Sequence, residues 1–230
     1  AAVRIEMRRN KIGTAKPLNV GLMGEHHRSL ILKLIRFNGR LSRAEVARTL
    51  GLAPSVVTRL VRELLDEGYL VEIGRSKTAL GRRPVLLEFN PDSATAVGAH
   101  IQRDKVECAL VNMGGTVLSR CELPFDDPPR PEEVLPSVAQ IVKDLCQHNT
   151  VGIGIAVSGR IDPHLGDQLF SPVLEWHKVG LKGFLEAECK LPVHVENDAS
   201  ALAVAELLHG AGRMYSDLVC VLVEIGRAHV

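Results

Sequence analysis

The chain has 230 residues, of which 46% are hydrophobic and 24% charged, and a formal net charge of +1. This length suits one large or two small domains, and the composition excludes global disorder. No apolar run reaches the roughly 18–20 residues of a membrane span, and the basic N-terminus lacks the apolar core of a signal peptide.

The near-zero net charge conceals an asymmetry along the chain. Residues 1–90 carry 17 Lys or Arg and 8 Asp or Glu, whereas residues 91–230 carry 11 and 19. A basic first third joined to an acidic remainder predicts two domains with different partners.

Both ends of the chain are set apart from the fold prediction. Residues 1–23 are basic with little periodicity, which predicts either an arm that contacts DNA or a disordered tail. The last seven residues, 224–230, can be encoded by GAGATCGGAAGAGCACACGTC, which largely matches a common sequencing adaptor. We expect them to be a non-native tail.

Residues 24–90 predict three helices followed by a hairpin. The first helix covers His26–Asn38, where apolar residues recur at helical spacing. Ser42 and Glu45 form a capping-box pattern that starts a short second helix ending at Gly51. Pro54 suits the first turn of a third helix, because its missing N–H would be unpaired there anyway.

The third helix has a polar and basic face near its start, which is typical of the recognition helix of a helix-turn-helix protein. Ser, Thr and Arg side chains can bond base edges in the major groove, and a valine can contact a thymine methyl. The predicted DNA-binding residues in the helical part are Ser42, Pro54, Ser55, Val56, Thr58, Arg59 and Arg62.

Two predicted strands, at 69–73 and 85–89, flank a basic segment. A hairpin with a basic tip is a wing, whose cations can lie along phosphates or enter the minor groove. The predicted wing residues that contact DNA are Arg75, Lys77, Arg82 and Arg83. A solvated basic hairpin on a helical interaction module is the alternative.

Asn90-Pro91-Asp92 interrupts the pattern and marks the predicted domain boundary. Hairpin-linked strands and then alternating helices and strands indicate an α/β domain with a mixed sheet over 95–223. We expect strands at 95–102, 105–112, 116–123, 151–157, 193–196 and 218–223, and helices at 131–148, 181–189 and 199–209. The segment 151–157 is expected to be a buried strand.

The cysteines and histidines predict no metal site within this chain. Five cysteines are scattered without a C-x-x-C pair, which fits reduced thiols in the cytoplasm better than disulfides. The histidines have no metal-ligand spacing.

Several segments together resemble motifs of the ROK family, named for repressors, open reading frames and kinases. They are Ser42-Arg43-Ala44-Glu45-Val46-Ala47, Gly81-Arg82-Arg83-Pro84-Val85-Leu86-Leu87, Gly152-Ile153-Gly154-Ile155-Ala156-Val157-Ser158-Gly159, Asp162-Pro163 and Val195-Glu196-Asn197-Asp198-Ala199. The resemblance covers about residues 24–223. It implies a winged helix-turn-helix joined to part of an actin/hexokinase-like (ribonuclease H-like) α/β domain. It also implies a cytoplasmic regulator, acting as a homodimer or larger homo-oligomer on operator DNA.

Kinases of this family begin the domain with a D-x-G-G-T loop, in which small residues let the backbone approach ATP phosphates. Here the kinase Asp falls on His100, the two glycines on Gln102 and Arg103, and the Thr on Asp104. These side chains predict the loss of efficient ATP use, so we expect no enzyme activity.

The resemblance places a candidate effector site at Gly159, Asn197 and Asp198. Asp198 matches the catalytic base of family kinases; without a phosphate loop we read it as an acceptor for hydroxyls of a sugar. A helix cap at Asp198 is the alternative. Val173 stands where family sugar sites often have Asn, and Trp176 suits either the core or a sugar platform. The zinc-binding Cys/His cluster that family members often carry lies beyond this sequence.

These observations predict a sequence-specific transcriptional regulator, a repressor of carbohydrate-related genes that responds to a sugar or sugar derivative. Two alternatives remain at this point. One is an ATP-dependent sugar kinase with a fused DNA-binding domain. The other is a regulator whose kinase-like domain only dimerises or binds a partner protein.

Overall fold

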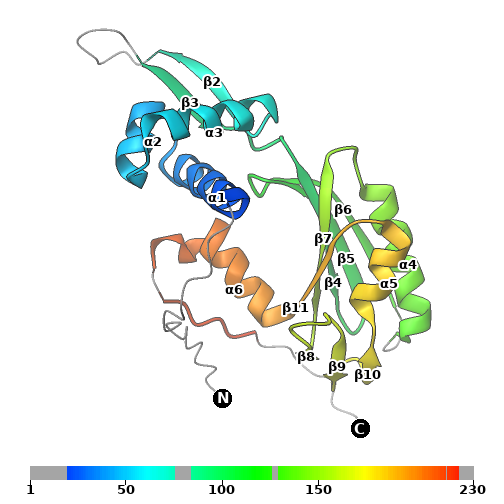
Figure 1. Ribbon diagram of the computed structural model, residues 1–230. Coiled ribbons are helices and arrows are strands. Elements are labelled where there is room, and N and C mark those ends of the chain that lie inside the picture. The colour runs from blue at the N-terminus through cyan, green and yellow to red at the C-terminus, as the bar shows by residue number, and fades with distance from the viewer. Residues whose placement is uncertain (1–19, 76–83, 126–128, 216, 223–230) are drawn as a thin grey trace. The chain divides into compact units, whose positions relative to one another are not determined.

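The computed structural model describes residues 20–75, 84–125, 129–215 and 217–222 (Figure 1). The chain separates into two compact units, residues 1–93 and 94–230. Most of the predicted arm, the tip of the wing and the suspected tail at 224–230 lie outside the described residues. None of the helices in the described ranges is long and apolar enough to cross a membrane.

The first unit contains three helices and a small antiparallel sheet with the strand order β1-β3-β2. Its elements are α1 (Val20–Asn38), β1 (Leu41–Ser42), α2 (Arg43–Leu50), α3 (Pro54–Asp66), β2 (Leu70–Arg75) and β3 (Val85–Phe89). All three predicted helices and both predicted strands are present. The first helix begins at Val20, before the expected start at His26.

Local signals in the sequence explain where these helices begin and end. The backbone N–H of Glu45 donates to the Ser42 hydroxyl at 3.3 Å, and the Glu45 carboxylate accepts from the Ser42 backbone N–H at 2.7 Å. This capping box satisfies donors that a helix start leaves unpaired. Gly51 ends α2 in the left-handed conformation, with φ +64°, which glycine adopts without steric cost.

One apolar cluster holds the first unit together. Its largest fully buried side chains come from α1, α3 and the sheet, and α2 adds smaller ones: Ile31, Ile35, Leu60, Leu64, Leu70 and Leu87, with Val46 and Ala47 from α2. Each such side chain contributes about 1.5–3 kcal/mol when it leaves water. The buried face of α3 therefore fixes how this helix packs in the unit and which of its residues are exposed.

The second unit is built on a five-stranded mixed sheet with the order β11-β7-β4-β5-β6. Its strands are β4 (Thr95–Ile101), β5 (Lys105–Asn112), β6 (Val117–Pro124), β7 (Thr150–Val157) and β11 (Val193–Asn197). The first three form the predicted antiparallel hairpins, and β7 joins β4 in parallel.

Helices cover the two faces of this sheet unequally. The helices α4 (Pro131–Leu145) and α5 (Leu181–Cys189) pack on one face, and α6 (Asp198–His209) lies on the other (Figure 1). The first face holds the apolar core, including Ile101, Leu110 and Val138. No residue of α6 is buried.

A second, three-stranded sheet with the order β10-β9-β8 was not predicted. Its strands are β8 (Arg160–Ile161), β9 (Gln168–Ser171) and β10 (Trp176–Val179). The strands are too short to show a period in the sequence. Trp176 is buried in the core and its indole N–H donates to the carbonyl of Pro129 at 2.6 Å. The core role is therefore the one that the structure supports for this residue.

Three expectations for the second unit are corrected. The strand at 150–157 is not buried along its length, since Val151 is 55% exposed. Residues 217–222 form no strand and pair with none of the strands in the described part of the chain. The last long helix begins at Asp198, because Asn197 and not Asp198 is its N-cap.

Candidate DNA-binding surface and effector site

The exposed face of α3 carries the residues predicted to read DNA. Ser55, Thr58, Arg59 and Arg62 are exposed on one helix, and Val56 is half-buried against the core of the first unit. Pro54 is exposed at the first position of the helix. The Thr58 hydroxyl donates to the Pro54 carbonyl at 2.8 Å, so at a groove edge its oxygen serves as an acceptor, whereas Ser55 and the two arginines supply donors.

Ser42 differs from its prediction as a DNA contact. The residue is 3% exposed and its hydroxyl donates to the Glu45 carboxylate at 2.7 Å. Its side chain is used up in the capping box, so Ser42 positions α2 and does not reach out from the surface.

A hollow of about 560 Å³ lies between α2 and the start of α3. Arg43 and Arg48 line it, with Thr58 on the other side. Arg43 also donates to Glu72 of β2 at 2.8 Å, which ties α2 to the hairpin. Sequence reasoning missed these two arginines, although both fall in or next to the Ser42–Ala47 motif.

The hairpin of the predicted wing is present as far as the structure describes it. Strands β2 and β3 pair antiparallel, with an irregularity between Glu72 and Arg75 next to Gly74, which has φ +104°. The structure describes the backbone of Arg75 within β2. Lys77, Arg82 and Arg83 lie outside the described residues.

Gly159 and Asn197 of the predicted effector site are in direct contact. Asn197 donates from its side-chain amide to the Gly159 carbonyl at 2.9 Å. Its Oδ1 accepts from the backbone N–H groups of Ala199 and Ser200, so the same side chain caps α6. Gly159 has φ +103°, and a Cβ atom there would lie 2.3 Å from the carbonyl oxygen of Phe170.

Asp198 follows Asn197 as the first residue of α6 and is half-buried. Its Oδ1 accepts from the Ala199 backbone N–H at 2.8 Å. The structure thus brings Gly159, Asn197 and Asp198 together at the ends of two parallel neighbours, β7 and β11. The ends of such strands are common places for ligand sites in α/β folds.

A buried polar network lies under the Gly159 turn, and sequence reasoning missed it. Gln168 is fully buried and donates to the Ser158 carbonyl at 2.8 Å. The hydroxyls of Ser158 and Ser171 are 2.8 Å apart, and both residues are buried. Two consecutive carbonyls, of Ser158 and Gly159, therefore each accept from a side-chain amide.

The turn between β4 and β5 holds the residues that the resemblance to family kinases matches to their phosphate loop. The side-chain amide nitrogen of Gln102 lies 3.1 Å from Nδ1 of His100. Arg103 donates to the carbonyl of Val173 at 3.1 Å, so its side chain bonds a residue outside this turn.

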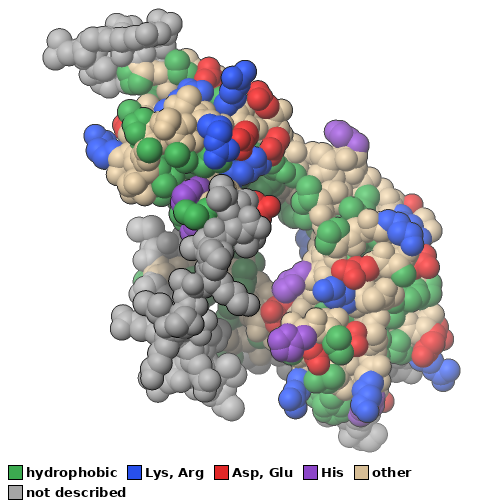
Figure 2. Space-filling view, in the orientation of Figure 1, with side chains coloured by type: hydrophobic (Ala, Val, Ile, Leu, Met, Phe, Trp, Pro, Cys, Tyr) green, Lys and Arg blue, Asp and Glu red, His purple; other side chains and the backbone are tan. Residues whose placement is uncertain are grey.

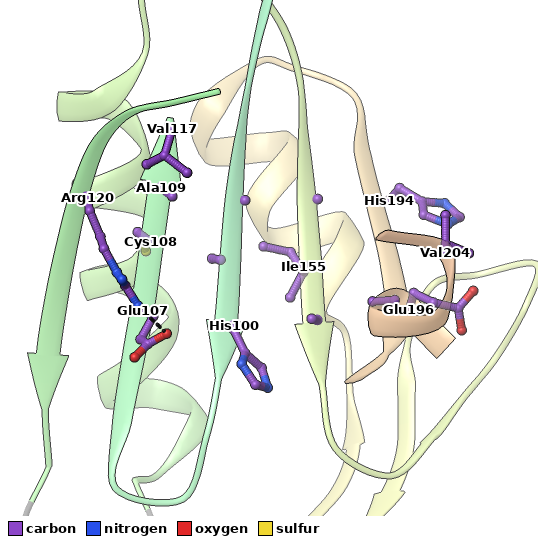
Figure 3. A pocket seen from close by; sticks show the side chains of 15 residues that line it. His100, Glu107, Cys108, Ala109, Val117, Arg120, Ile155, His194, Glu196 and Val204 are labelled. Carbon is purple, nitrogen blue, oxygen red and sulfur yellow. Dashed lines mark hydrogen bonds and ion pairs between the residues drawn. The ribbon is translucent and has the colours of Figure 1, made fainter. Parts of the chain in front are cut away.

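A larger hollow of about 620 Å³ opens over the sheet face that α6 covers in part (Figure 3). Its floor is made of Gly98, Ala109, Gly154 and Ala156, and its rim carries His100, His194 and Glu196. Glu107 accepts hydrogen bonds from Lys105 and Arg120, which lower the pKa of its carboxyl. Among the described residues, no group of His, Cys, Asp and Glu could hold a metal ion.

Comparison with known proteins identifies the second unit. Residues 96–227 match the ROK family, and residues 26–71 match a winged helix-turn-helix DNA-binding domain. The chain belongs to the ROK family. The fold predicted from the sequence, a winged helix-turn-helix followed by part of a ROK domain, is confirmed.

The curated relatives of this ROK chain include a xylose repressor and a transcriptional dual regulator. It is 32% identical over 214 residues to the xylose repressor of Caldicellulosiruptor bescii. The alignment covers 90% of this chain and 54% of that protein. It is 26% identical over 221 residues to the DNA-binding transcriptional dual regulator NagC of Escherichia coli K12. That alignment covers 93% of this chain and 54% of NagC. The chain therefore spans about half the length of the curated relatives it matches.

A solved structure has the same fold. A ROK family transcriptional regulator, described as a homologue of the E. coli MLC protein, superposes with a TM-score of 0.69 at 24% identity. The superposition covers 83% of this chain and 50% of that one.

Proposed function

We propose that this ROK protein is a sequence-specific DNA-binding transcriptional regulator of the cytoplasm, a repressor of carbohydrate-related genes. The observation that carries the proposal is the exposed face of α3, where Ser55, Thr58, Arg59 and Arg62 stand on a helix held by a complete apolar core. The names of its relatives, a xylose repressor and a DNA-binding transcriptional dual regulator, support the same interpretation.

The surface suggests how DNA would be bound. The start of α3 enters the major groove, where Arg59 can bond a guanine and Val56 can contact a thymine methyl. Arg43 and Arg48 beside the groove, and the wing residues Lys77 and Arg82, neutralise phosphates without reading sequence. A homodimer would place two such readers on two half-sites of an operator.

The ROK domain is proposed to bind a sugar or sugar derivative at the Gly159–Asn197–Asp198 site. Asp198 would accept hydroxyl hydrogens, while Asn197 holds the turn at Gly159 in place. Effector binding would favour one arrangement of the two DNA readers over another. This requires different effector affinities in the two states.

A DNA-binding assay with the full-length protein tests the proposal. A gel shift or footprint on the region upstream of its own operon, with and without D-xylose or N-acetylglucosamine, is expected to show specific binding that one sugar changes. Arg59→Ala should reduce sequence preference, and Lys77→Ala should weaken binding to any duplex and flatten its salt dependence. No sequence-specific binding at moderate salt would overturn the proposal.

The exposed apolar residues of α6 favour a second candidate, in which the ROK domain binds a protein partner or another copy of itself. Leu202, Val204 and Leu208 are each 40–52% exposed on this helix. Stabilisation of the full-length protein by a sugar would count against this candidate. ATP-dependent sugar phosphorylation by the full-length protein would overturn our interpretation of the β4–β5 turn and favour a sugar kinase with a fused DNA-binding domain.

A further inference from the structure

The arginine proposed to read bases is tied to an acidic side chain of its own helix. Arg59 bonds Glu63 at 2.6 Å, one helical turn further along α3. The other oxygen of Glu63 accepts from Arg28 of α1 at 3.4 Å. One carboxylate therefore links an exposed guanidinium to a second helix.

Arg28 holds Glu63 from a fixed position. It also bonds both oxygens of Glu67 at the end of α3, in a two-pronged pair. The Arg28 side chain is 25% exposed, whereas Arg59 is 59% exposed. An isolated Glu–Arg pair on a helix surface rearranges easily, but this Glu63 is anchored on the side away from Arg59.

Arg62 provides the contrast within the same exposed face. It lies three residues from Arg59 on α3 and has no ion pair or hydrogen bond in the described part of the chain. Basic and acidic side chains lie beside one another over the visible surface of the helical unit (Figure 2). The pairing of Arg59 is thus a property of this residue and not of every arginine on the helix.

We propose that Glu63 is a specificity-determining residue, which restrains Arg59 so that the arginine contributes to selective DNA binding and little to non-selective binding. The proposal rests on the proposed function as a DNA-binding regulator. Arg59 bonds Glu63 through Nη1 alone, which leaves Nε and Nη2 for a two-pronged contact with a guanine while the pair stays intact. A phosphate contact on random DNA would instead draw Arg59 away from Glu63 and cost the energy of the pair. The anchored carboxylate therefore lowers affinity for random DNA more than affinity for the operator.

The test compares two duplexes and a double-mutant cycle in the full-length protein. One duplex is selected by the protein from a randomised library, and the other is a scrambled duplex of equal length and base composition. Glu63→Gln is expected to strengthen binding to the scrambled duplex and to lower the ratio of the two affinities by at least about twofold. The salt dependence on the scrambled duplex should steepen by about one phosphate contact, because the released Arg59 can reach a phosphate.

Two controls separate this effect from a simple loss of negative charge. Glu88 lies on β3 and pairs with Arg40. The Glu88→Gln variant removes this acidic partner and should change both affinities by the same factor. In an Arg59→Gln background, Glu63→Gln should leave the ratio unchanged, whereas in an Arg62→Gln background it should still lower the ratio. An unchanged ratio in the Glu63→Gln protein, or an equal effect without Arg59, would overturn the inference alone. A wild-type protein that does not distinguish the duplexes would overturn the proposed function as well.

Discussion

The side-chain amide of Asn197 donates to the carbonyl of Gly159 at 2.9 Å, and so joins the end of β11 to the turn after β7. The same side chain accepts from the first N–H groups of α6. One residue therefore sets both the start of a helix and the shape of a turn. Asp198 comes next, and its own carboxylate accepts from the Ala199 backbone N–H at 2.8 Å.

Gly159→Ala is expected to destabilise the ROK unit by about 2 kcal/mol or more. The left-handed backbone is costly for alanine, and the new methyl group would meet the Phe170 carbonyl oxygen and Ser171 backbone. Gly98→Ala is the matched control, since nothing lies within 4 Å of a Cβ there. Thermal unfolding of both variants checks this. Equal melting temperatures would contradict the reading of the Gly159 turn.

Replacing Asn197 should separate its two roles. Asn197→Asp keeps an oxygen that can cap α6 but loses the N–H that the Gly159 carbonyl accepts. Asn197→Ala loses both, and its missing cap alone should cost about 1 kcal/mol. We expect both variants to weaken stabilisation by the effector sugar, and only the alanine variant to lose the full capping contribution. Melting curves with and without sugar measure both effects; a normal sugar response in the aspartate variant would argue against a role for the turn.

The sequence predicted the first unit well because its signals are local. Ser42 with Glu45, Gly51 and Pro54 mark helix ends within three or four residues, and each does so in the structure. The proposed effector site is less visible in the sequence, since it depends on parallel pairing between β7 and β11, about forty residues apart. A family motif indicated Asn197 and Asp198, but the residue types alone did not show which of the two caps the helix.

Buried polar residues were the hardest to find from the sequence. Gln168 has no local pattern that distinguishes it from a surface glutamine, yet it is fully buried against Ser158. The short strands β8, β9 and β10 were missed for a related reason, since strands of two to four residues have no measurable period. Likewise, the ion pair between Arg59 and Glu63 is suggested by their spacing, but its anchoring by Arg28 comes from tertiary structure.

Ser42→Ala should destabilise the helix-turn-helix unit by about 1 kcal/mol, a typical value for a lost N-cap. The variant removes the acceptor of the Glu45 backbone N–H and the hydroxyl that contacts the Glu45 carboxylate. Hydrogen bonds from the Ser42 backbone N–H, which the variant keeps, and from the Ser42 hydroxyl hold the pKa of the Glu45 carboxyl below its usual value. Ser55→Ala is the control, because Ser55 is exposed on α3 and caps no helix. Ser42→Ala should therefore unfold at a lower temperature than Ser55→Ala. Only Ser55→Ala changes a side chain on the proposed DNA-reading face.

The stability of the helix-turn-helix unit should depend on pH through Glu67. Hydrogen bonding to the Arg28 guanidinium holds the pKa of the Glu67 carboxyl below its usual value. A carboxyl whose pKa is lower in the folded than in the unfolded state stabilises the fold above the unfolded pKa, about 4.3 for Glu. That contribution is lost as the pH falls through the pKa of Glu67 in the folded state.

Glu67→Gln should therefore melt at a lower temperature than the wild type at pH 6–7, and the difference in melting temperature should shrink in acid. Added salt should reduce it as well, because the pair is partly exposed. A difference in melting temperature that stays constant from neutral pH to pH 3 would show that the Glu67 charge is not what stabilises the junction of α1 and α3.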